Sequence, residues 1–261
     1  MLKTRIITAA IGIPILLGIA YMGGNYWAGF ITLLTAVVLL EYFAMMRHQG
    51  FQPIILPAFL IAFILLFRAQ LSQNLVGLLF TGLLLMILSM VLRYPRINHS
   101  DLALSLFAAF YTGFLFSYAL ALTEFGRSFH ILLLIFILTW ASDVGGYLFG
   151  RLWGKNKMVP QLSPGKTWEG AIGAVLLTII AALLYKYLIK MEYLGVVYII
   201  MLGLLASVAA QLGDLLESSI KRYFGVKDSS QIIPGHGGVM DRFDSFMLML
   251  PVVYYFLVVF V

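Results

Sequence analysis

The sequence predicts an all-α, polytopic integral membrane protein with about nine transmembrane helices and a polar site that faces the cytoplasm. Of its 261 residues, 62% are hydrophobic and only 11% are charged. The mean hydropathy is +1.00, and long apolar runs recur between short polar breaks. Runs of roughly 20 apolar residues are typical of helices that cross a bilayer. We therefore expect one membrane domain over residues 1–261.

The apolar runs give the expected spans in chain order. The first follows Lys3 and Arg5, and we expect it to be retained because it has no small-x-small cleavage site and another span follows at once. The third is interrupted at its start by Pro53 and Pro57 and is closed by Arg68. The spans lie near residues 6–22, 26–45, 54–69, 75–92, 102–122, 130–149, 170–189, 194–217 and 243–261.

The distribution of the cations predicts the orientation in the membrane. If the N-terminus is cytoplasmic and the spans alternate, every Lys and Arg is cytoplasmic except Arg68, Arg127, Lys186 and Lys190. This bias follows the positive-inside rule. The absence of cysteine excludes disulfides, thiol chemistry and Cys-ligated metals.

The two halves of the chain differ in their acidic residues. Residues 1–130 are nearly uninterrupted apolar helix, and we interpret them as scaffold. Their acids, Glu41, Asp101 and Glu124, lie near predicted span ends, where we expect the interface to solvate them. Residues 131–261 are interpreted as the catalytic part, because their acids, Glu192 excepted, flank two loops on the same side. These acids are Asp143, Glu169, Asp214, Glu217, Asp228, Asp241 and Asp244.

A polar stripe marks the span that ends near residue 222. Its members recur at intervals of three or four, so they share one helix face, which must meet protein, water or ligand and not lipid. Ser207 and Gln211 suit a hydrogen-bonded seam between helices, whereas the carboxylate of Asp214 needs a cation. The stripe consists of Ser207, Gln211, Asp214, Ser218 and Lys221, with Glu217 beside it.

The segment before the last span combines glycines, a histidine and acids. Asp241 and Asp244 are three residues apart, so they share a face once a helix has begun. Together with Asp214 they would suit Mg²⁺, which prefers carboxylates completed by phosphate and water oxygens. His236, between Gly235 and Gly237-Gly238, is either a ligand or acid, or a satisfied loop histidine.

The earlier loop offers glycines and cations. Gly146, Gly150 and Gly154 recur at every fourth residue, which indicates either a close-packing ridge or backbone exposed to a ligand. The sequence Pro164-Gly165-Lys166-Thr167 lacks the spacing and preceding strand of a P-loop. We expect a flexible basic loop whose backbone amides and Lys166 bind phosphate.

These parts predict phosphoryl or nucleotidyl transfer to a lipid at the membrane surface. Neither a Ser/His/Asp hydrolase pattern nor a zinc-binding HExxH motif is present. No nucleic-acid partner is expected, because the cations lack the soluble scaffold of a nucleic-acid binder.

At these residues the sequence resembles the CDP-diacylglycerol synthases, also called phosphatidate cytidylyltransferases. The motifs that carry the resemblance run from about Asp143 to Asp244, and they include residues 143–151 and 163–170. The family signature is matched in order and spacing by Ser218, Lys221, Arg222, Lys227, Asp228, His236, Gly237, Gly238, Asp241, Arg242 and Asp244.

The resemblance implies that CTP and phosphatidic acid give CDP-diacylglycerol and pyrophosphate, with Mg²⁺ required. It also implies metal binding by Asp214 and Asp241, a homodimer, and a place in the bacterial inner membrane with the N-terminus and active site cytoplasmic. We expect Asp143 and Asp244 to support the metal or a second cation, and Lys221 and His236 to be catalytic alongside Asp214 and Asp241. The expected phosphate-binding residues are Lys166, Thr167, Lys221, Arg222, Lys227, Asp228, Gly237, Gly238 and Arg242.

Three alternatives remain at this point. A CTP-dependent polyprenol kinase could use similar nucleotide-binding parts but would transfer the γ-phosphoryl group to an alcohol. A membrane transporter would place its charges near the midplane on broken helices, whereas here they cluster at loop boundaries. A catalytically inactive scaffold has support only from the long apolar N-terminal half.

Overall fold

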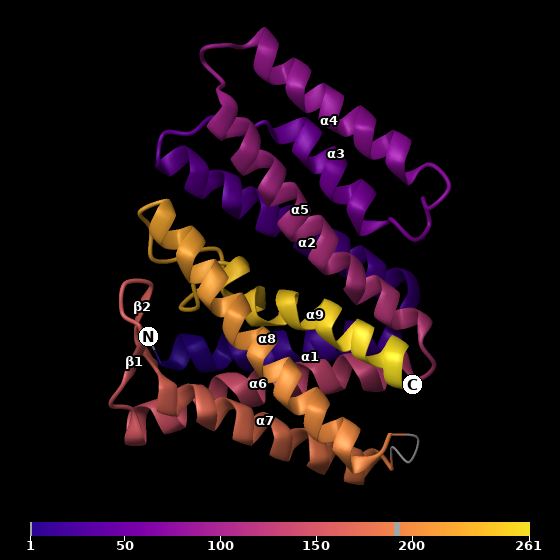
Figure 1. Ribbon diagram of the computed structural model, residues 1–261, viewed down its shortest axis with the longest axis vertical. Coiled ribbons are helices and arrows are strands. Elements are labelled where there is room, and N and C mark those ends of the chain that lie inside the picture. The colour runs from indigo at the N-terminus through magenta and orange to yellow at the C-terminus, as the bar shows by residue number, and fades with distance from the viewer. Residues whose placement is uncertain (1, 191–193) are drawn as a thin grey trace. The chain divides into compact units, whose positions relative to one another are not determined.

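The computed structural model describes residues 2–190 and 194–261, with side chains from residue 6 onward, and most of them are helical (Figure 1). The predicted all-α architecture is confirmed. The described chain contains nine α-helices: α1 (Leu2–Met22), α2 (Gly24–His48), α3 (Ile55–Leu66), α4 (Leu75–Leu92), α5 (His99–Ala121), α6 (Ser128–Trp153), α7 (Trp168–Ile189), α8 (Val196–Tyr223) and α9 (Met240–Phe260).

Seven helices of the described part are long and apolar enough to cross a membrane, namely α2 and α4 to α9, with α5 counted together with the short 3-10 turn that follows it. The third predicted span, 54–69, is shorter than expected. Helix α3 has 12 residues, which span about 18 Å at 1.5 Å per residue, against about 30 Å of hydrocarbon. Pro53 precedes it and a run of turns from 67 to 74 ends it, so the apolar run is longer than the helix.

A small β-hairpin replaces the flexible loop expected between α6 and α7. Strands β1 (Lys157–Val159) and β2 (Ser163–Thr167) pair antiparallel. The carboxylate of Glu169 holds its base, because Oε2 accepts from the backbone N–H of Lys155 at 3.1 Å and Oε1 accepts from the Asn156 side-chain amide at 2.7 Å. The basic loop is therefore an ordered element tied to the first turn of α7.

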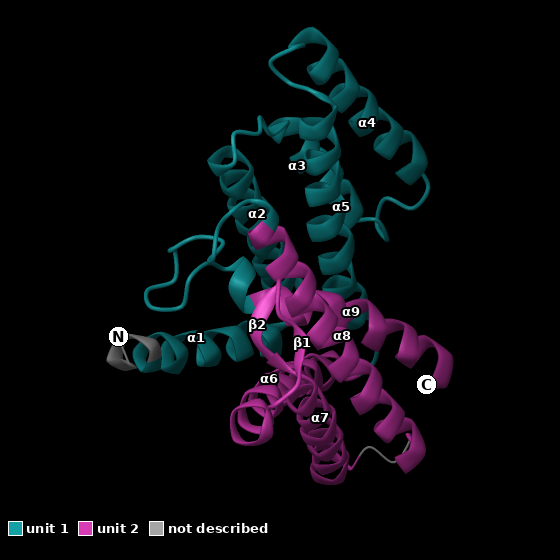
Figure 2. Cartoon of the chain, turned by 60° about the vertical axis from the view of Figure 1, so that its left-hand side comes forward, with its two compact units in different colours: residues 1–126, 223–242 teal, residues 127–222, 243–261 magenta. Residues whose placement is uncertain are grey.

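The chain divides into two compact units, each built from two separate stretches (Figure 2). Unit 1 contains residues 1–126 and 223–242, and unit 2 contains residues 127–222 and 243–261. The expected change of role near residue 130 lies close to the first boundary, but residues 223–242 group with the N-terminal helices. That a single membrane domain covers residues 1–261 stays a prediction.

Unit 1 is held together by close helix contacts and buried aromatic side chains. A Cβ at Gly113 on α5 would lie 2.3 Å from the carbonyl oxygen of Ala62 on α3, so only glycine lets these helices approach so closely. The indole of Trp27, buried on α2, donates to the carbonyl of Ala119 on α5 at 2.8 Å. These contacts place α2, α3 and α5 side by side.

Unit 2 depends on glycines at the interface of α6 and α7. A Cβ at Gly145 would lie 2.7 Å from the carbonyl oxygen of Gly173, and one at Gly170 would lie 2.8 Å from that of Gly146. A Cβ at Gly150 would lie 3.3 Å from the hydroxyl of Thr167. Small residues let two helix backbones approach, and the close-packing interpretation is borne out at Gly150. A Cβ at Gly146 itself would meet its first atom only at 3.9 Å.

Candidate active site

In unit 2 the polar stripe of α8 divides into a structural half and a charged half. The hydroxyl of Ser207 lies 3.2 Å from that of Ser142 on α6. The side-chain amide of Gln211 donates to the carbonyl of Ala171 on α7 at 3.3 Å and to Ser207 at 3.1 Å. The interhelical seam predicted for Ser207 and Gln211 is confirmed.

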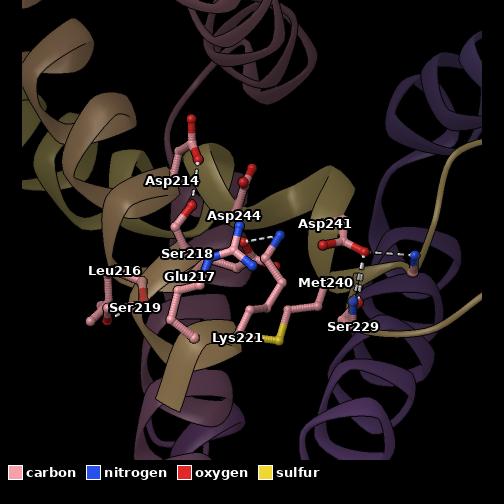
Figure 3. Close-up of polar contacts among 12 residues, drawn as sticks. Asp214, Leu216, Glu217, Ser218, Ser219, Lys221, Ser229, Met240, Asp241 and Asp244 are labelled. Atoms are coloured by element: carbon pink, nitrogen blue, oxygen red, sulfur yellow. Dashed lines mark hydrogen bonds and ion pairs between the residues drawn. The ribbon is translucent and has the colours of Figure 1, made fainter. Parts of the chain in front are cut away.

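Asp214, one turn further along α8, meets a cation from the hairpin. Its Oδ2 lies 2.7 Å from Nζ of Lys166 on β2. The hydroxyl of Ser218 donates to its Oδ1 at 3.4 Å (Figure 3). The Asp214 side chain remains 35% exposed and that of Lys166 24% exposed. The ordered hairpin therefore places a lysine beside the carboxylate. Nζ of Lys166 is itself buried, so the exposed part of its side chain is the stem, while the Asp214 side chain stays partly exposed.

Two other carboxylates of unit 2 act electrostatically on Asp244. Asp244 is half-buried on α9, feels the negative charges of Asp214 and Asp143, and is stabilised by the positive charge of Lys221. The hydroxyl of Ser245 donates to Asp143 Oδ1 at 3.5 Å. Like charges that interact favour the presence of a cation nearby, and Lys221 is one such positive group. We call Asp143, Asp214 and Asp244, with Lys166 and Lys221, the carboxylate–lysine cluster.

Glu217, which the sequence placed only beside the stripe, is a buried part of this region. Its side chain is 0% exposed, and its Oε2 lies 2.6 Å from Nζ of Lys221, whose side chain is 14% exposed (Figure 3). A buried carboxylate needs a counter-charge, and this one holds a lysine of the cluster in place. Its spacing of four from Lys221 on a helix was the signal available in the sequence.

In unit 1 the loop between α8 and α9, residues 224–239, is organised around Asp241, and we call it the signature loop. Its Oδ2 accepts from the backbone N–H of Ser229 at 3.0 Å, from the Ser229 hydroxyl at 3.0 Å and from the N–H of Gly238 at 2.8 Å (Figure 3). Gly237 adopts φ +84°, and a Cβ there would lie 2.8 Å from the same oxygen. Asp241, predicted as a metal ligand, thus also folds the signature loop onto itself.

The expectation that Glu41 and Asp101 are solvated at the interface is wrong, since both are only 1% exposed. Asp101 caps α5 by accepting from the backbone N–H of Asn98 at 2.8 Å, and it also accepts from that of Gln52 at 2.7 Å. Glu41 on α2 contacts the signature loop. Glu124 is exposed, as expected. The reason for the error is that a position near a span end does not reveal which distant backbone donors will cover a carboxylate.

His236 and Arg242 occupy the turn that precedes α9. The guanidinium Nε of Arg242 donates to the backbone carbonyl of His236 at 3.0 Å. Within the described residues, Nδ1 of His236 is buried and has no hydrogen-bond partner. A buried ring nitrogen without a hydrogen-bond partner costs free energy unless a ligand supplies one, so the interpretation of His236 as a ligand-binding residue gains support.

The remaining predicted phosphate-binding residues differ in position. Thr167 is buried and caps α7, since its hydroxyl accepts from the N–H of Gly170 at 3.1 Å, so the structure gives it a structural role. Arg222 is exposed and its Nε donates to the carbonyl of Leu162 at 3.3 Å. Lys227 and Asp228 are exposed in unit 1.

Among residues 6–190 and 194–261 no group of three or more His, Asp or Glu side chains is arranged to hold a metal ion. The carboxylates predicted as metal ligands offer only oxygen donors, which are the kind that Mg²⁺ prefers. Asp143, Asp214 and Asp244 belong to unit 2 and Asp241 to unit 1, and their binding of a metal stays a prediction.

Comparison with known proteins identifies relatives over nearly the whole chain. A family model described as "Cytidylyltransferase family" matches residues 3–260. A protein called phosphatidate cytidylyltransferase from Staphylococcus haemolyticus is 35% identical over 257 residues, which cover 96% of each chain. One from Staphylococcus aureus is 34% identical over 259 residues, again 96% of each chain. A third, from Staphylococcus saprophyticus, is 41% identical over 161 residues, which cover 62% of this chain and 61% of the relative.

Proposed function

The chain belongs to the cytidylyltransferase family, and from this premise we propose that it transfers a cytidylyl group from CTP to phosphatidic acid. The products are CDP-diacylglycerol and pyrophosphate. The observation that carries the proposal is the carboxylate–lysine cluster, which combines oxygen ligands for a cation with lysines for phosphate beside apolar, membrane-length helices. The names of the relatives support the choice of lipid substrate.

The reaction depends on neutralising negative charge more than on a strong base. The phosphate monoester of phosphatidic acid has a second pKa near 6, so it is already nucleophilic at neutral pH. Its oxygen forms a bond to the α-phosphorus of CTP while the bond from that phosphorus to the bridging oxygen breaks, and pyrophosphate leaves. The protein must bring two anions together, align them and stabilise the departing charge.

The cations are assigned to these tasks. Lys166 and Lys221 lie in the carboxylate–lysine cluster, where they would neutralise the phosphates of CTP. Further positive charge comes from Lys227 in the signature loop and from Arg222 and Arg242, which flank it in sequence. His236, with its buried Nδ1, would bind a phosphate oxygen or give a proton to pyrophosphate.

We assign a magnesium ion to Asp214 and Asp241, supported by Asp143 and Asp244, which could also hold a second cation. When bound, Mg²⁺ would supply Lewis-acid stabilisation of phosphate charge. Lys166 balances the charge of Asp214, since its Nζ lies 2.7 Å from Oδ2. Lys166 is thus already placed beside an oxygen that a bound nucleotide–metal complex would use.

We further propose that the protein is a homodimer of the bacterial inner membrane, with its N-terminus and active site cytoplasmic. The cation distribution supports this orientation. Surface labelling of single cysteines, introduced into the naturally cysteine-free chain at the hairpin turn and at Gly126, tests it. The hairpin position should react only with a cytoplasmic reagent and the Gly126 position only with an external one.

The deciding experiment uses purified protein, phosphatidic acid, Mg²⁺ and CTP carrying label either in the cytidine or in the γ-phosphate. Cytidine label should enter lipid, and the γ-label should leave as pyrophosphate. Entry of γ-label into a lipid would establish a kinase instead and overturn the proposal. Uptake of labelled substrate into vesicles without any lipid product would identify a transporter.

A further inference from the structure

Within the described residues, Glu41 on α2 accepts four hydrogen bonds from the signature loop of unit 1 and the first residue of α9. Oε1 accepts from the hydroxyl of Ser230 at 2.6 Å and from the N–H of Val239 at 2.8 Å. Oε2 accepts from the hydroxyl of Ser229 at 3.0 Å and from the N–H of Met240 at 2.7 Å. One carboxylate therefore binds both ends of the segment 229–240.

The surroundings of Glu41 suit a fixed anion. The residue is 1% exposed, and its donors include two backbone N–H groups at the start of α9, where the helix dipole favours negative charge. A Cβ at Gly238 would lie 1.9 Å from the Ser229 hydroxyl and 2.8 Å from both oxygens of Glu41. Only glycine at position 238 lets the loop close around this carboxylate.

Glu41 is coupled to Asp241 through a single hydroxyl. The Ser229 hydroxyl oxygen lies 3.0 Å from Glu41 Oε2 and 3.0 Å from Asp241 Oδ2, so the two carboxylates share its single proton. Asp241 Oδ2 also accepts from the N–H groups of Ser229 and Gly238. Both carboxylates therefore bind the same turn. A shift of the loop at Glu41 must move the donors that orient Asp241.

We infer that Glu41 is a positioning residue: it fixes segment 229–240 and so sets the orientation of the Asp241 carboxylate. This inference rests on the proposed function in that Asp241 is assigned there to the metal. It gives the N-terminal half, expected to be only scaffold, a direct part in shaping the site.

The test is Glu41→Gln in the full-length protein. Glutamine keeps the size of the side chain but presents an NH₂ group to one of the two backbone N–H donors. Two donors then face each other, and residue 41 loses at least one of its hydrogen bonds to segment 229–240. We expect amide hydrogen exchange of residues 229–240 to rise about 10- to 100-fold, as for loss of a charged hydrogen bond. We also expect the Mg²⁺ concentration for half-maximal cytidylyl transfer to rise about tenfold.

Asp101→Asn is the matched control, because Asp101 is an equally buried carboxylate of unit 1 that accepts from the backbone N–H groups of Gln52 and Asn98. It should lower thermal stability while leaving both the Mg²⁺ dependence and exchange of residues 229–240 as in the wild type. If Glu41→Gln does not accumulate, Ser230→Ala removes one donor to Glu41 without changing charge and should shift both readouts in the same direction by a smaller factor. Because the Ser230 hydroxyl also accepts from the N–H of Ile232, exchange at Ile232 is left out of that comparison.

The inference would be overturned if residues 229–240 exchanged their amide hydrogens at the wild-type rate in the Glu41→Gln variant. The same holds for Ser230→Ala where that variant replaces it. An equal Mg²⁺ shift in Asp101→Asn would also overturn it, because the effect would then be general destabilisation. If the wild-type protein shows no cytidylyl transfer, the proposed function fails, and the exchange measurement alone still decides whether Glu41 fixes the loop.

Discussion

Replacing Lys221 by methionine separates the structural and chemical parts of the Lys221–Glu217 pair. Nζ lies 2.6 Å from Oε2, the Glu217 side chain is 0% exposed and that of Lys221 is 14% exposed. Removing one partner of a buried pair leaves an uncompensated charge and costs about 3 to 5 kcal/mol. At about 2 to 4 °C per kcal/mol for a chain of this size, the thermal midpoint should fall by about 6 to 20 °C.

The double variant Lys221→Met with Glu217→Gln supplies the comparison. With both charges removed and similar volumes kept, the midpoint should return to within a few degrees of the wild type, because replacing a whole buried pair is often nearly neutral. Cytidylyl transfer should stay at least about 100-fold reduced, since Lys221 is assigned to a phosphate. Thermal unfolding followed by tryptophan fluorescence in detergent, and the labelled-CTP assay, give the two readouts.

Two outcomes would refute this reasoning. A single variant that unfolds at the wild-type temperature would show that the pair contributes little despite its burial. A double variant that regains most activity would show that Lys221 acts only through stability and contacts no substrate.

Three further predictions concern separate features. Asp214→Asn and Asp241→Asn should each abolish turnover and weaken Mn²⁺ binding measured by electron paramagnetic resonance, while the protein stays folded; most activity kept in both would exclude the metal assignment. Gly145→Ala should lower the free energy of unfolding by about 1 to 3 kcal/mol, because the new methyl group would meet a backbone carbonyl at 2.7 Å. Gly77→Ala, where no atom lies within 4 Å of the new methyl group, should be neutral or stabilising in the same thermal assay. Thr167→Val should cost about 1 kcal/mol through loss of the α7 cap, and Thr167→Ser should not; equal effects of both would exclude the capping role.

The bounds of a helix were predicted correctly where the apolar run begins and ends at the same residues as the helix. Helices α4 and α7 match their predicted spans within two residues, because charged or turn-forming residues end both the run and the helix. Helix α3 failed this test, since apolar residues continue into turns after residue 66. The hairpin also escaped prediction. Its strands have three and five residues, and Pro164 and Gly165 in the second strand are atypical of a sheet.

The candidate site was predictable where its chemistry lies on one helix. The spacing of Asp214, Ser218 and Lys221 on α8 indicated one face, and the structure places their side chains in the same region. Glu41 was missed because its partners are 188 to 199 residues away, and no helical period reports a contact of that range. The one local signal was its position as an acid within an apolar run, and solvation at the interface was a sufficient explanation for that position.

The long separation between Glu41 and its loop affects how the protein is made. At the usual rate of about 5 to 20 residues per second, a ribosome takes about 10 to 40 s to advance from Glu41 to Ser229. During that interval the carboxylate has none of its final donors. The nascent N-terminal helices must therefore wait, with this acid covered by water or by the insertion machinery, until nearly the entire polypeptide has been translated.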